Sequence, residues 1–395
     1  MGLLMTSLAS ATTQPPGAIA QQRQWVGFGL SNLVGVLALS VASWWLLADP
    51  QWSPLHLYPL PFNAGLFWAI LFVVFIGFCS EFVGFDRLRQ PWRGLAIMAG
   101  TVVFAVVVTW ALGRGLGALF PTFAADRAGG LGWFSGALFV LFGFGTWVMV
   151  VLNWGLWPWK SWGLDQPRVG LSAIAFVAIP TLALYVVIGL PSVSESASTA
   201  LMSNDTVLGW FYCIVVSVIL TGQTIDNWPW SWFGEHAPAK LSPSATIALA
   251  STIGNVVVGT ALYFLALPFL RLLLGSVTSD ALGGAIHQFP AQLGVCWAFW
   301  MIFWANACGN RPTTGNVIVG RVARAVITFA LAVVTFLVYY RWGAAVVLHE
   351  PALAPGISGN ALGFMDWMVL WTLFYVVGFE SWGLRNPSRP DALAP

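Results

Sequence analysis

Long apolar runs alternate with short polar segments along the whole chain. A helix that crosses a bilayer needs about 20 mostly apolar residues, and ten runs of this kind follow one another. The pattern therefore predicts an all-α polytopic integral membrane protein with about ten transmembrane helices. The expected spans are residues 25–48, 62–84, 93–119, 131–154, 168–192, 206–226, 243–275, 292–309, 317–343 and 362–380.

One kind of turn recurs after every second run. Each such turn contains a glycine that can supply the left-handed residue at a helix end, followed by a proline that suits the start of the next helix. The glycines are Gly84, Gly163, Gly234, Gly309 and Gly383, and the prolines, which lie 71 to 76 residues apart, are Pro91, Pro167, Pro238, Pro312 and Pro387. A period of roughly 75 residues holds two spans. We therefore expect five parallel helix-hairpin repeats, which could close into a ring around a central cavity.

The positive charges predict how the spans are oriented. Twelve of the 16 Lys and Arg residues lie on the side of the amino terminus and the repeated turns. Cytoplasmic loops are enriched in these residues, so we expect both termini to be cytoplasmic. This places a single transmembrane bundle at 25–380, between a mobile tail at 1–24 and a cytoplasmic tail at 381–395. We expect the plasma membrane, or the inner membrane of a bacterium, as the location.

Composition supports a membrane protein and excludes several classes of function. The chain is 58% hydrophobic and 8% charged, with a mean hydropathy of +0.80, whereas soluble domains carry about 25% charged residues. There is no basic stripe for nucleic acid and no phosphate-binding Walker sequence. The four histidines lie outside the spans and the four cysteines form no C-x-x-C pair. We therefore predict no metal, no cofactor and no nucleic-acid partner.

Uncharged polar residues enter the cytoplasmic halves of several spans. Asn153, Gln223, Asn255 and Asn306 lie there, and polar groups in hydrocarbon must find partners. They either form hydrogen bonds between helices or line a hydrated cavity. We predict that they bind the substrate.

Tryptophans crowd two of the repeated turns. Trp157 and Trp159 flank one proline, and Trp228 and Trp230 flank another. One interpretation is an aromatic belt at headgroup depth combined with a helix stop. The other is an aromatic cage for a cationic or aromatic ligand, in which these side chains guard the cytoplasmic mouth.

Acidic residues lie at span ends. Glu81, Asp226 and Glu380 lie at cytoplasmic ends and are candidates for coupling residues, with ordinary surface groups as the alternative. Asp366 is expected in the first turn of the last span, on the outer side. A proton-driven pump usually needs an ionisable group inside the membrane, and none is expected at a span centre.

Three functions remain. The first is a transporter or channel for a small neutral or amphipathic organic solute. The second is a non-catalytic scaffold subunit of a larger membrane complex that contacts lipids, pigments or partner helices. The third is an enzyme acting on a lipid or isoprenoid, for which His236 and Glu235 form the one adjacent acid–imidazole pair on the cytoplasmic side. The expected partners are the bilayer, a solute, and either further copies of the chain or other membrane subunits.

Overall fold

The computed structural model describes residues 16–194 and 200–387, and within them the chain is almost entirely helical. Nine of the helices in these two ranges are long and apolar enough to cross a membrane. The only strands in the same ranges are a short antiparallel pair, β1 (Ala352–Ala354) and β2 (Ile357–Ser358). The prediction of an all-α, multi-pass membrane protein is therefore confirmed.

Five of the long helices form an inner layer. Each packs on the next, in the order α2, α4, α7, α11 and α14, and α14 returns to α2, so the layer is a closed ring. Most residues in the apolar stretches of α2, α4, α7 and α14 are buried. The inner helices are α2 (Phe62–Val73) with η1 (Val74–Cys79), α4 (Leu131–Leu152), α7 (Asn204–Ile219) with η9 (Leu220–Thr224), α11 (Phe289–Ala307), and α14 (Ala361–Trp371) with η12 (Thr372–Gly378).

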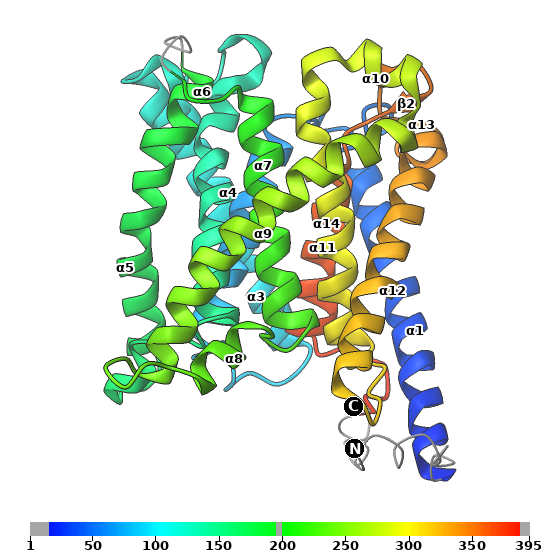
Figure 1. Cartoon of the computed structure of the whole chain (residues 1–395). Helices are drawn as coiled ribbons and strands as arrows, with labels where there is room; N and C mark the ends of the chain where they lie inside the picture. Colours follow the sequence, from blue (N-terminus) through cyan, green and yellow to red (C-terminus); the bar gives the residue numbers. More distant parts are fainter. Residues whose placement is uncertain (1–15, 195–199, 388–395) are drawn as a thin grey trace.

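The other five long helices form an outer layer. Each packs mainly against one inner helix: α3 on α2, α5 on α4, α9 on α7, α12 on α11 and α1 on α14. Fewer than a third of the residues in their apolar stretches are buried, as expected for helices that face lipid. Figure 1 shows α5 and α1 at opposite edges of the bundle. The outer helices are α1 (Pro16–Leu47), α3 (Trp92–Trp110) with η2 (Ala111–Gly115) and η3 (Leu116–Ala118), α5 (Arg168–Leu184) with η7 (Tyr185–Gly189) and α6 (Leu190–Val193), α9 (Pro243–Leu274), and α12 (Val317–Val338) with η11 (Tyr339–Gly343) and α13 (Ala344–Val346).

Short elements complete the two ends of the bundle. We call the end that carries the repeated turns the turn side and the opposite end the loop side. Residues 24–31 of α1 and residues 384–387 line one surface depression, so the start of α1 and the last described residues lie together at the turn side (Figure 1). The turn side holds η6 (Lys160–Trp162) and α8 (Trp230–Glu235), and the loop side holds η4 (Pro121–Phe123), η5 (Ala128–Gly130), α10 (Ser276–Leu282) and η10 (Gly283–Gln288).

Two helices differ from the expected spans. The helix α1 begins at Pro16, so the segment from residue 16 to residue 24 is helical, whereas the sequence suggested a tail there. The parts of the two expected tails at residues 1–15 and 388–395 lie outside the described residues. The helix α11 corresponds to the eighth expected span, 292–309, but is not among the nine apolar helices, because three tryptophans and two polar amides lower its hydropathy.

The inner helices share one kind of ending. Directly after each of them come two consecutive residues with positive φ, at 81–82, 155–156, 226–227, 309–310 and 380–381. In four of the five, the second of these N–H groups bonds the carbonyl six residues earlier, as from Phe82 to Ile76 and from Ser381 to Tyr375. This bond satisfies a carbonyl left open at the helix end.

Glycine supplies these left-handed residues less often than the sequence suggested. Gly84, Gly163, Gly309 and Gly383 have positive φ, but only Gly309 belongs to a pair that ends an inner helix. Gly234 lies inside α8, so its expected role as a helix stop was wrong. The fixed turn geometry tolerates residues other than glycine because the surrounding hydrogen bonds hold it.

Candidate functional site

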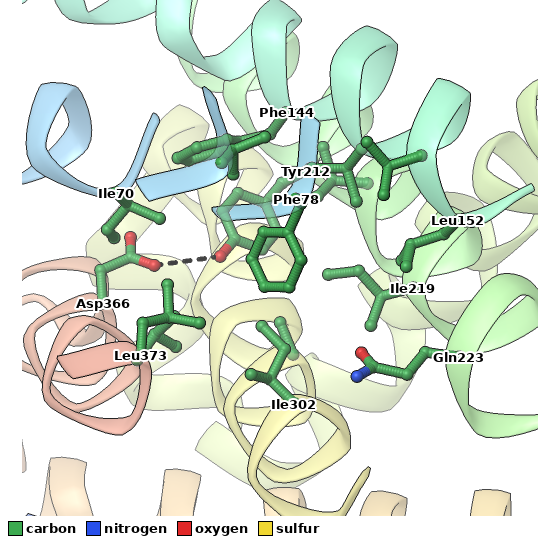
Figure 2. Close-up of a pocket in the computed structure, with 16 residues that line it drawn as sticks. Ile70, Phe78, Phe144, Leu152, Tyr212, Ile219, Gln223, Ile302, Asp366 and Leu373 are labelled. Atoms are coloured by element: carbon green, nitrogen blue, oxygen red, sulfur yellow. Dashed lines mark hydrogen bonds between the residues drawn. The ribbon is translucent and has the colours of Figure 1, made fainter. Parts of the chain in front are cut away.

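A cavity lies on the axis of the inner ring, and all five inner helices contribute to its wall (Figure 2). Its volume is about 80 Å³, which exceeds the roughly 30 Å³ that one water molecule occupies in the liquid. Most of the wall is aliphatic or phenyl carbon. Three polar side chains interrupt it, those of Tyr212, Gln223 and Asp366.

Asp366 is a buried carboxyl in this wall. Its residue is 2% exposed. One carboxyl oxygen, Oδ1, accepts a hydrogen bond of 3.4 Å from the Tyr212 hydroxyl, which Figure 2 shows as a dashed line. The other oxygen, Oδ2, is buried and has no hydrogen-bond partner. A buried polar atom without a partner is uncommon in proteins and calls for an explanation.

The position of Asp366 corrects the sequence analysis. The side chain of Asn360 accepts a hydrogen bond from the Leu362 N–H and caps α14, so Asp366 falls in the second turn and not at the outer surface. Asp366, Val369 and Leu373 recur at helical spacing and all face the cavity. An acid within an apolar span is itself a signal of function, and that signal was available in the sequence.

Gln223 lies at the other end of the cavity. It belongs to the last turn of η9, and in Figure 2 its amide is well separated from Asp366. The backbone carbonyl of Gln223 accepts a hydrogen bond of 2.9 Å from the Asn310 side chain. This bond fixes the backbone and leaves the side-chain amide at the cavity wall.

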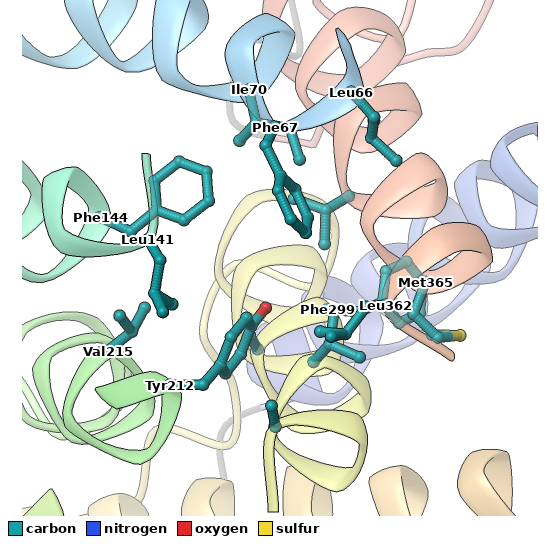
Figure 3. Packing of buried hydrophobic residues seen from close by; sticks show 14 of the residues in the cluster. Leu66, Phe67, Ile70, Leu141, Phe144, Tyr212, Val215, Phe299, Leu362 and Met365 are labelled. Carbon is teal, nitrogen blue, oxygen red and sulfur yellow. The ribbon is translucent and has the colours of Figure 1, made fainter. Parts of the chain in front are cut away.

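A layer of apolar side chains fills the ring on the loop side of the cavity. Leu66 and Phe67 of α2 and Leu362 of α14 lie one helical turn toward the loop side of the wall residues Ile70 and Asp366 (Figure 3), and all three are less than 9% exposed. The cavity wall, by contrast, reaches the last residue of α4 and the last turn of η9. The cavity therefore extends from the level of Asp366 and Tyr212 to the turn-side ends of α4 and η9.

Asn153 and Asn255 belong to a saturated polar network and do not line the cavity. The Asn153 amide nitrogen donates to Thr221 at 3.2 Å and to Asn227 at 2.9 Å. Its amide oxygen accepts from Asn255 at 3.1 Å, and the Asn255 oxygen accepts from Ser217 and Thr221. Every amide oxygen and nitrogen of the two asparagines therefore has a partner. The network joins α4, α7 and α9.

The remaining sequence candidates lie apart from the cavity. The Asn306 amide nitrogen bonds the Ile302 carbonyl of its own helix at 2.8 Å. Trp157 packs edge-on against Trp154, and Trp228 is 42% exposed. Trp230 packs so tightly on α9 that a Cβ at Gly254 would lie 2.0 Å from its ring.

Trp159 lines a different depression, an apolar groove of about 800 Å³ between the outer helices α5 and α9. Trp154, Trp162 and Phe176 lie in the same wall. The four tryptophans named from the sequence are thus not brought together around one site.

The three acids at the ends of inner helices are all paired. Lys160 contacts Glu81 at 2.8 Å, Arg93 contacts Glu380, and Asp226 contacts Arg324 at 2.6 Å and Arg321 at 3.3 Å. In every case the cation lies in, or directly after, the neighbouring turn around the ring. Lys160 donates a hydrogen bond to Glu81 and holds the pKa of that carboxyl below its usual range.

Side-chain amides reinforce the same junctions. The last carbonyls of four inner helices accept hydrogen bonds from amides that belong to the following turn around the ring. The pairs are Gln166 to Cys79, Asn227 to Asn153, Asn310 to Gln223 and Gln90 to Gly378, each at 2.9 Å. These bonds satisfy carbonyls that a helix end leaves open.

A second buried carboxyl lies outside the spans, on the loop side. Glu350 accepts hydrogen bonds from the Tyr339 hydroxyl at 2.6 Å, from the Asn360 N–H at 2.9 Å and from the Tyr58 hydroxyl. Burial raises the pKa of Glu350 to about 7. Nearby, His349 contacts Asp49 at 2.8 Å. The cluster ties the segment after α1 to the segment before α14.

The acid–imidazole pair named from the sequence is at the surface. Glu235 and His236 are both exposed at the end of α8, and a His236 ring nitrogen lies 2.8 Å from the Trp232 carbonyl oxygen. Within residues 16–194 and 200–387, no three His, Cys, Asp or Glu side chains are grouped as a metal site requires.

The fold and the cavity together define a polytopic α-helical membrane protein with a buried carboxyl at the centre of its inner helices. Comparison of the chain with protein-family models, with curated proteins and with solved structures found no match.

Proposed function

We propose that this protein is a membrane transporter for a small amphipathic organic solute, which binds in the cavity of the inner ring. The observation that carries the proposal is the position of that cavity, since every inner helix contributes to it and it encloses a buried carboxyl. Ligand sites are typically apolar hollows with a few convergent polar groups. Asp366, Tyr212 and Gln223 supply those groups.

The proposal includes ten spans in five parallel hairpin repeats. Support comes from the alternation of inner and outer helices and from the left-handed pair that follows each inner helix. The helix α11 brings the number of spans to ten, because it occupies one position of the ring. The excess of Lys and Arg on the turn side favours a cytoplasmic location for that side and for both termini, in the plasma membrane or a bacterial inner membrane.

Transport needs access to the cavity from each side in turn. Residues at the turn-side ends of α4 and η9 line the cavity, and Gln223 is partly exposed. The layer of Leu66, Phe67 and Leu362 separates it from the loop side. We infer a cytoplasm-facing state, in which movement of that layer would open the other route.

The earlier candidates take supporting roles in this proposal. Asn153 and Asn255 position α4, α7 and α9 through their shared network. Glu81, Asp226 and Glu380 hold neighbouring hairpins together through ion pairs and do not couple transport to an ion gradient. Asn306 and the four tryptophans (Trp157, Trp159, Trp228 and Trp230) shape the turns and the membrane interface, without contact to the solute.

The two other functions receive less support. Exposed apolar side chains of the outer helices, such as Val103, Phe176 and Val257, are what lipid contact requires and do not single out a scaffold subunit. An enzyme acting on a lipid needs a base or acid close to its substrate. His236 and Glu235 are exposed on α8, and Asp366 has no second acid or base beside it in the cavity wall.

The test begins by identifying what the cavity holds. The protein is extracted gently from its native membrane, and native mass spectrometry measures the mass of any retained molecule. That molecule is then used in a counterflow assay in proteoliposomes. Ala298→Phe fills the cavity wall, whereas Ala183→Phe places the same side chain in the lipid-facing groove. We expect counterflow to be lost in the first variant and kept in the second.

Equal counterflow in the two variants would show that the cavity is not part of the transport route. Co-purification of foreign subunits in fixed stoichiometry, with no retained small molecule, would favour the scaffold function. Because Phe at position 298 risks overpacking, the folding of both variants is checked by their thermal unfolding before counterflow is measured.

A further inference from the structure

We propose that the solute of the central cavity is an organic cation, whose ammonium group pairs with Asp366. This inference rests on the proposed transport function and adds the charge of the substrate. It starts from the carboxyl group, because Asp366 is the one acidic side chain in the cavity wall and no Lys, Arg or His is among the residues that line it.

The hydrogen bonds of Asp366 leave room for a donor. The Tyr212 hydroxyl is a neutral partner at 3.4 Å, which is longer than the 2.7–3.0 Å usual for a bond between two oxygens. The buried Oδ2 has no partner. An ammonium donor at about 2.8 Å from this oxygen would form a charge-assisted bond, which is shorter and stronger than a neutral one.

Five positive side chains outside the cavity have partners of their own. Lys160, Arg93, Arg321 and Arg324 contact acids at the turn side. The Arg341 guanidinium lies near the carbonyls of Leu273 and Leu274 at the end of α9. None of these side chains belongs to the cavity wall, so a cation that enters from solution is the natural partner for an ionised Asp366. Charged side chains within membrane bundles usually pair with a group of opposite charge.

The rest of the wall suits the body of such a ligand. Phe78, Phe144 and Tyr212 present aromatic rings to the cavity, and aromatic rings attract cations through their negatively charged faces. Aliphatic side chains such as Ile219 and Ile302 would contact alkyl groups. The small volume of about 80 Å³ favours a short alkyl or branched amine over a long-chain one.

Charge and shape can be separated with matched ligands. Purified protein in nanodiscs of zwitterionic lipid is titrated with n-alkylammonium ions, from methyl to hexyl, and with n-alkanols of the same lengths. Binding is measured as the concentration-dependent rise in unfolding temperature. We expect the best alkylammonium ion to bind at least about tenfold more tightly than its alkanol, a difference of about 1.4 kcal/mol.

Variants at Asp366 and Glu350 show which carboxyl produces the preference for ammonium. Asp366→Asn keeps the size of the side chain and removes its charge, so the preference for ammonium should disappear. Asp366→Glu keeps the charge and should retain part of the preference. Glu350→Gln removes a buried carboxyl that lies outside the cavity, and should bind like the wild type. The unfolding temperature of each variant without ligand verifies folding.

The outcomes distinguish the inference from the function on which it rests. If alkanols and alkylammonium ions bind equally, and Ala298→Phe weakens both, the cavity takes neutral solutes. The proposal that the solute is a cation is then wrong, and the proposal of a solute site in the cavity is kept. If neither series binds, or if binding is unchanged in Ala298→Phe, the proposed solute site is overturned as well. An ammonium preference that persists in Asp366→Asn also contradicts the inference.

Discussion

At the scale of single residues, two kinds of polar side chain within the spans bear on the site. Those of the first kind satisfy one another, as Asn153 and Asn255 do in the network between α4, α7 and α9. Those of the second kind keep unused hydrogen-bonding capacity and face the cavity, as Asp366 does. A buried group without a partner is costly, so only the second kind points to a ligand.

Loss of Asn153 should affect stability and leave ligand binding intact. Asn153→Ala removes the partner of Asn255, Asn227 and Thr221, and leaving a buried polar group unsatisfied costs about 1–3 kcal/mol. Asn306→Ala is the matched control, because the Asn306 side chain bonds only a carbonyl of its own helix. Thermal unfolding in nanodiscs compares the two. Equal losses of stability in Asn153→Ala and Asn306→Ala would show that the Asn153 network does not stabilise the packing of α4, α7 and α9.

Glu350 predicts a pH dependence that can be measured. Burial raises its pKa to about 7, against an ordinary value near 4.3 for glutamate. The folded state therefore binds the proton more tightly than the unfolded state, and this contribution to stability is greatest at low pH and declines as the pH rises through about 7. Tyr58, Tyr339, Tyr340, Asp49 and His349 surround or adjoin the carboxyl.

In Glu350→Gln, the dependence of unfolding temperature on pH between about pH 5 and pH 8 should be shallower than in the wild type. The same series in His349→Gln separates the effect of the neighbouring histidine. If Glu350→Gln leaves the pH dependence of the unfolding temperature unaltered, groups other than Glu350 produce that dependence.

The sequence identifies these polar residues but does not determine which of them share a site. Asn153, Gln223, Asn255 and Asn306 all lie at similar depth along their spans. The structure turns Gln223 toward the cavity and Asn153 toward α7 and α9. The rotation of each helix about its axis decides this, and that rotation depends on side-chain packing across the whole ring.

At the scale of elements, neighbouring hairpins are joined at the turn side by a repeated pair of contacts. An amide side chain caps the last carbonyls of one inner helix, and at three junctions an acid at the end of that helix pairs with a cation of another hairpin. The sequence shows the acids and the turns but not the pairing, because the partners lie many residues apart. This explains why Glu81, Asp226 and Glu380 looked like free helix-end groups.

The strengths of the junctions should follow their exposure. The side chains of Lys160 and Glu81 are 50% and 52% exposed, and exposed pairs contribute about 0.2–1 kcal/mol. The Arg324 side chain is 7% exposed and that of Asp226 is 43% exposed, so removing Asp226 leaves a nearly buried cation with the Asn310 carbonyl but no acidic partner, which costs more.

Double-mutant cycles with alanine at Lys160 and Glu81, and at Arg324 and Asp226, measure the two coupling energies. We expect more than about 1 kcal/mol for the second pair and less for the first. Coupling energies of the reverse order would contradict the importance of burial at these junctions.

At the scale of the whole molecule, the sequence predicts the number of apolar helices well and their arrangement only in part. Hydropathy identifies spans because lipid excludes unpaired polar backbone from any other structure. Hydropathy does not identify α11 as a span, because its tryptophans and amides lower its hydropathy. These side chains are nevertheless compatible with a position between other helices. The 71- to 76-residue spacing of the turns suggested hairpins, whereas the closed inner ring depends on contacts between distant segments.

The proposed orientation makes a prediction for the two ends of the bundle. A cysteine introduced at Ser161, on the turn side, should react with a membrane-impermeant maleimide only from the cytoplasmic face. A cysteine at Leu119, on the loop side, should react only from the opposite face. Both positions are exposed, so the comparison depends on sidedness alone. Reaction of Ser161→Cys from outside intact cells would show that the orientation is opposite to the proposed one.

The central claim is that the inner ring encloses a solute site that is reached from the turn side. Gln223→Cys tests it most directly, in a chain whose partly exposed Cys308 is replaced by Ala. The measurement is the rate of reaction with a small impermeant thiol reagent, added to either face of membrane vesicles. We predict reaction from the turn side only, slowed by a short alkylammonium ion in the solution. A cysteine that reacts from neither side, or whose reaction no solute slows, would show that the centre of the ring is packed protein and not a binding site.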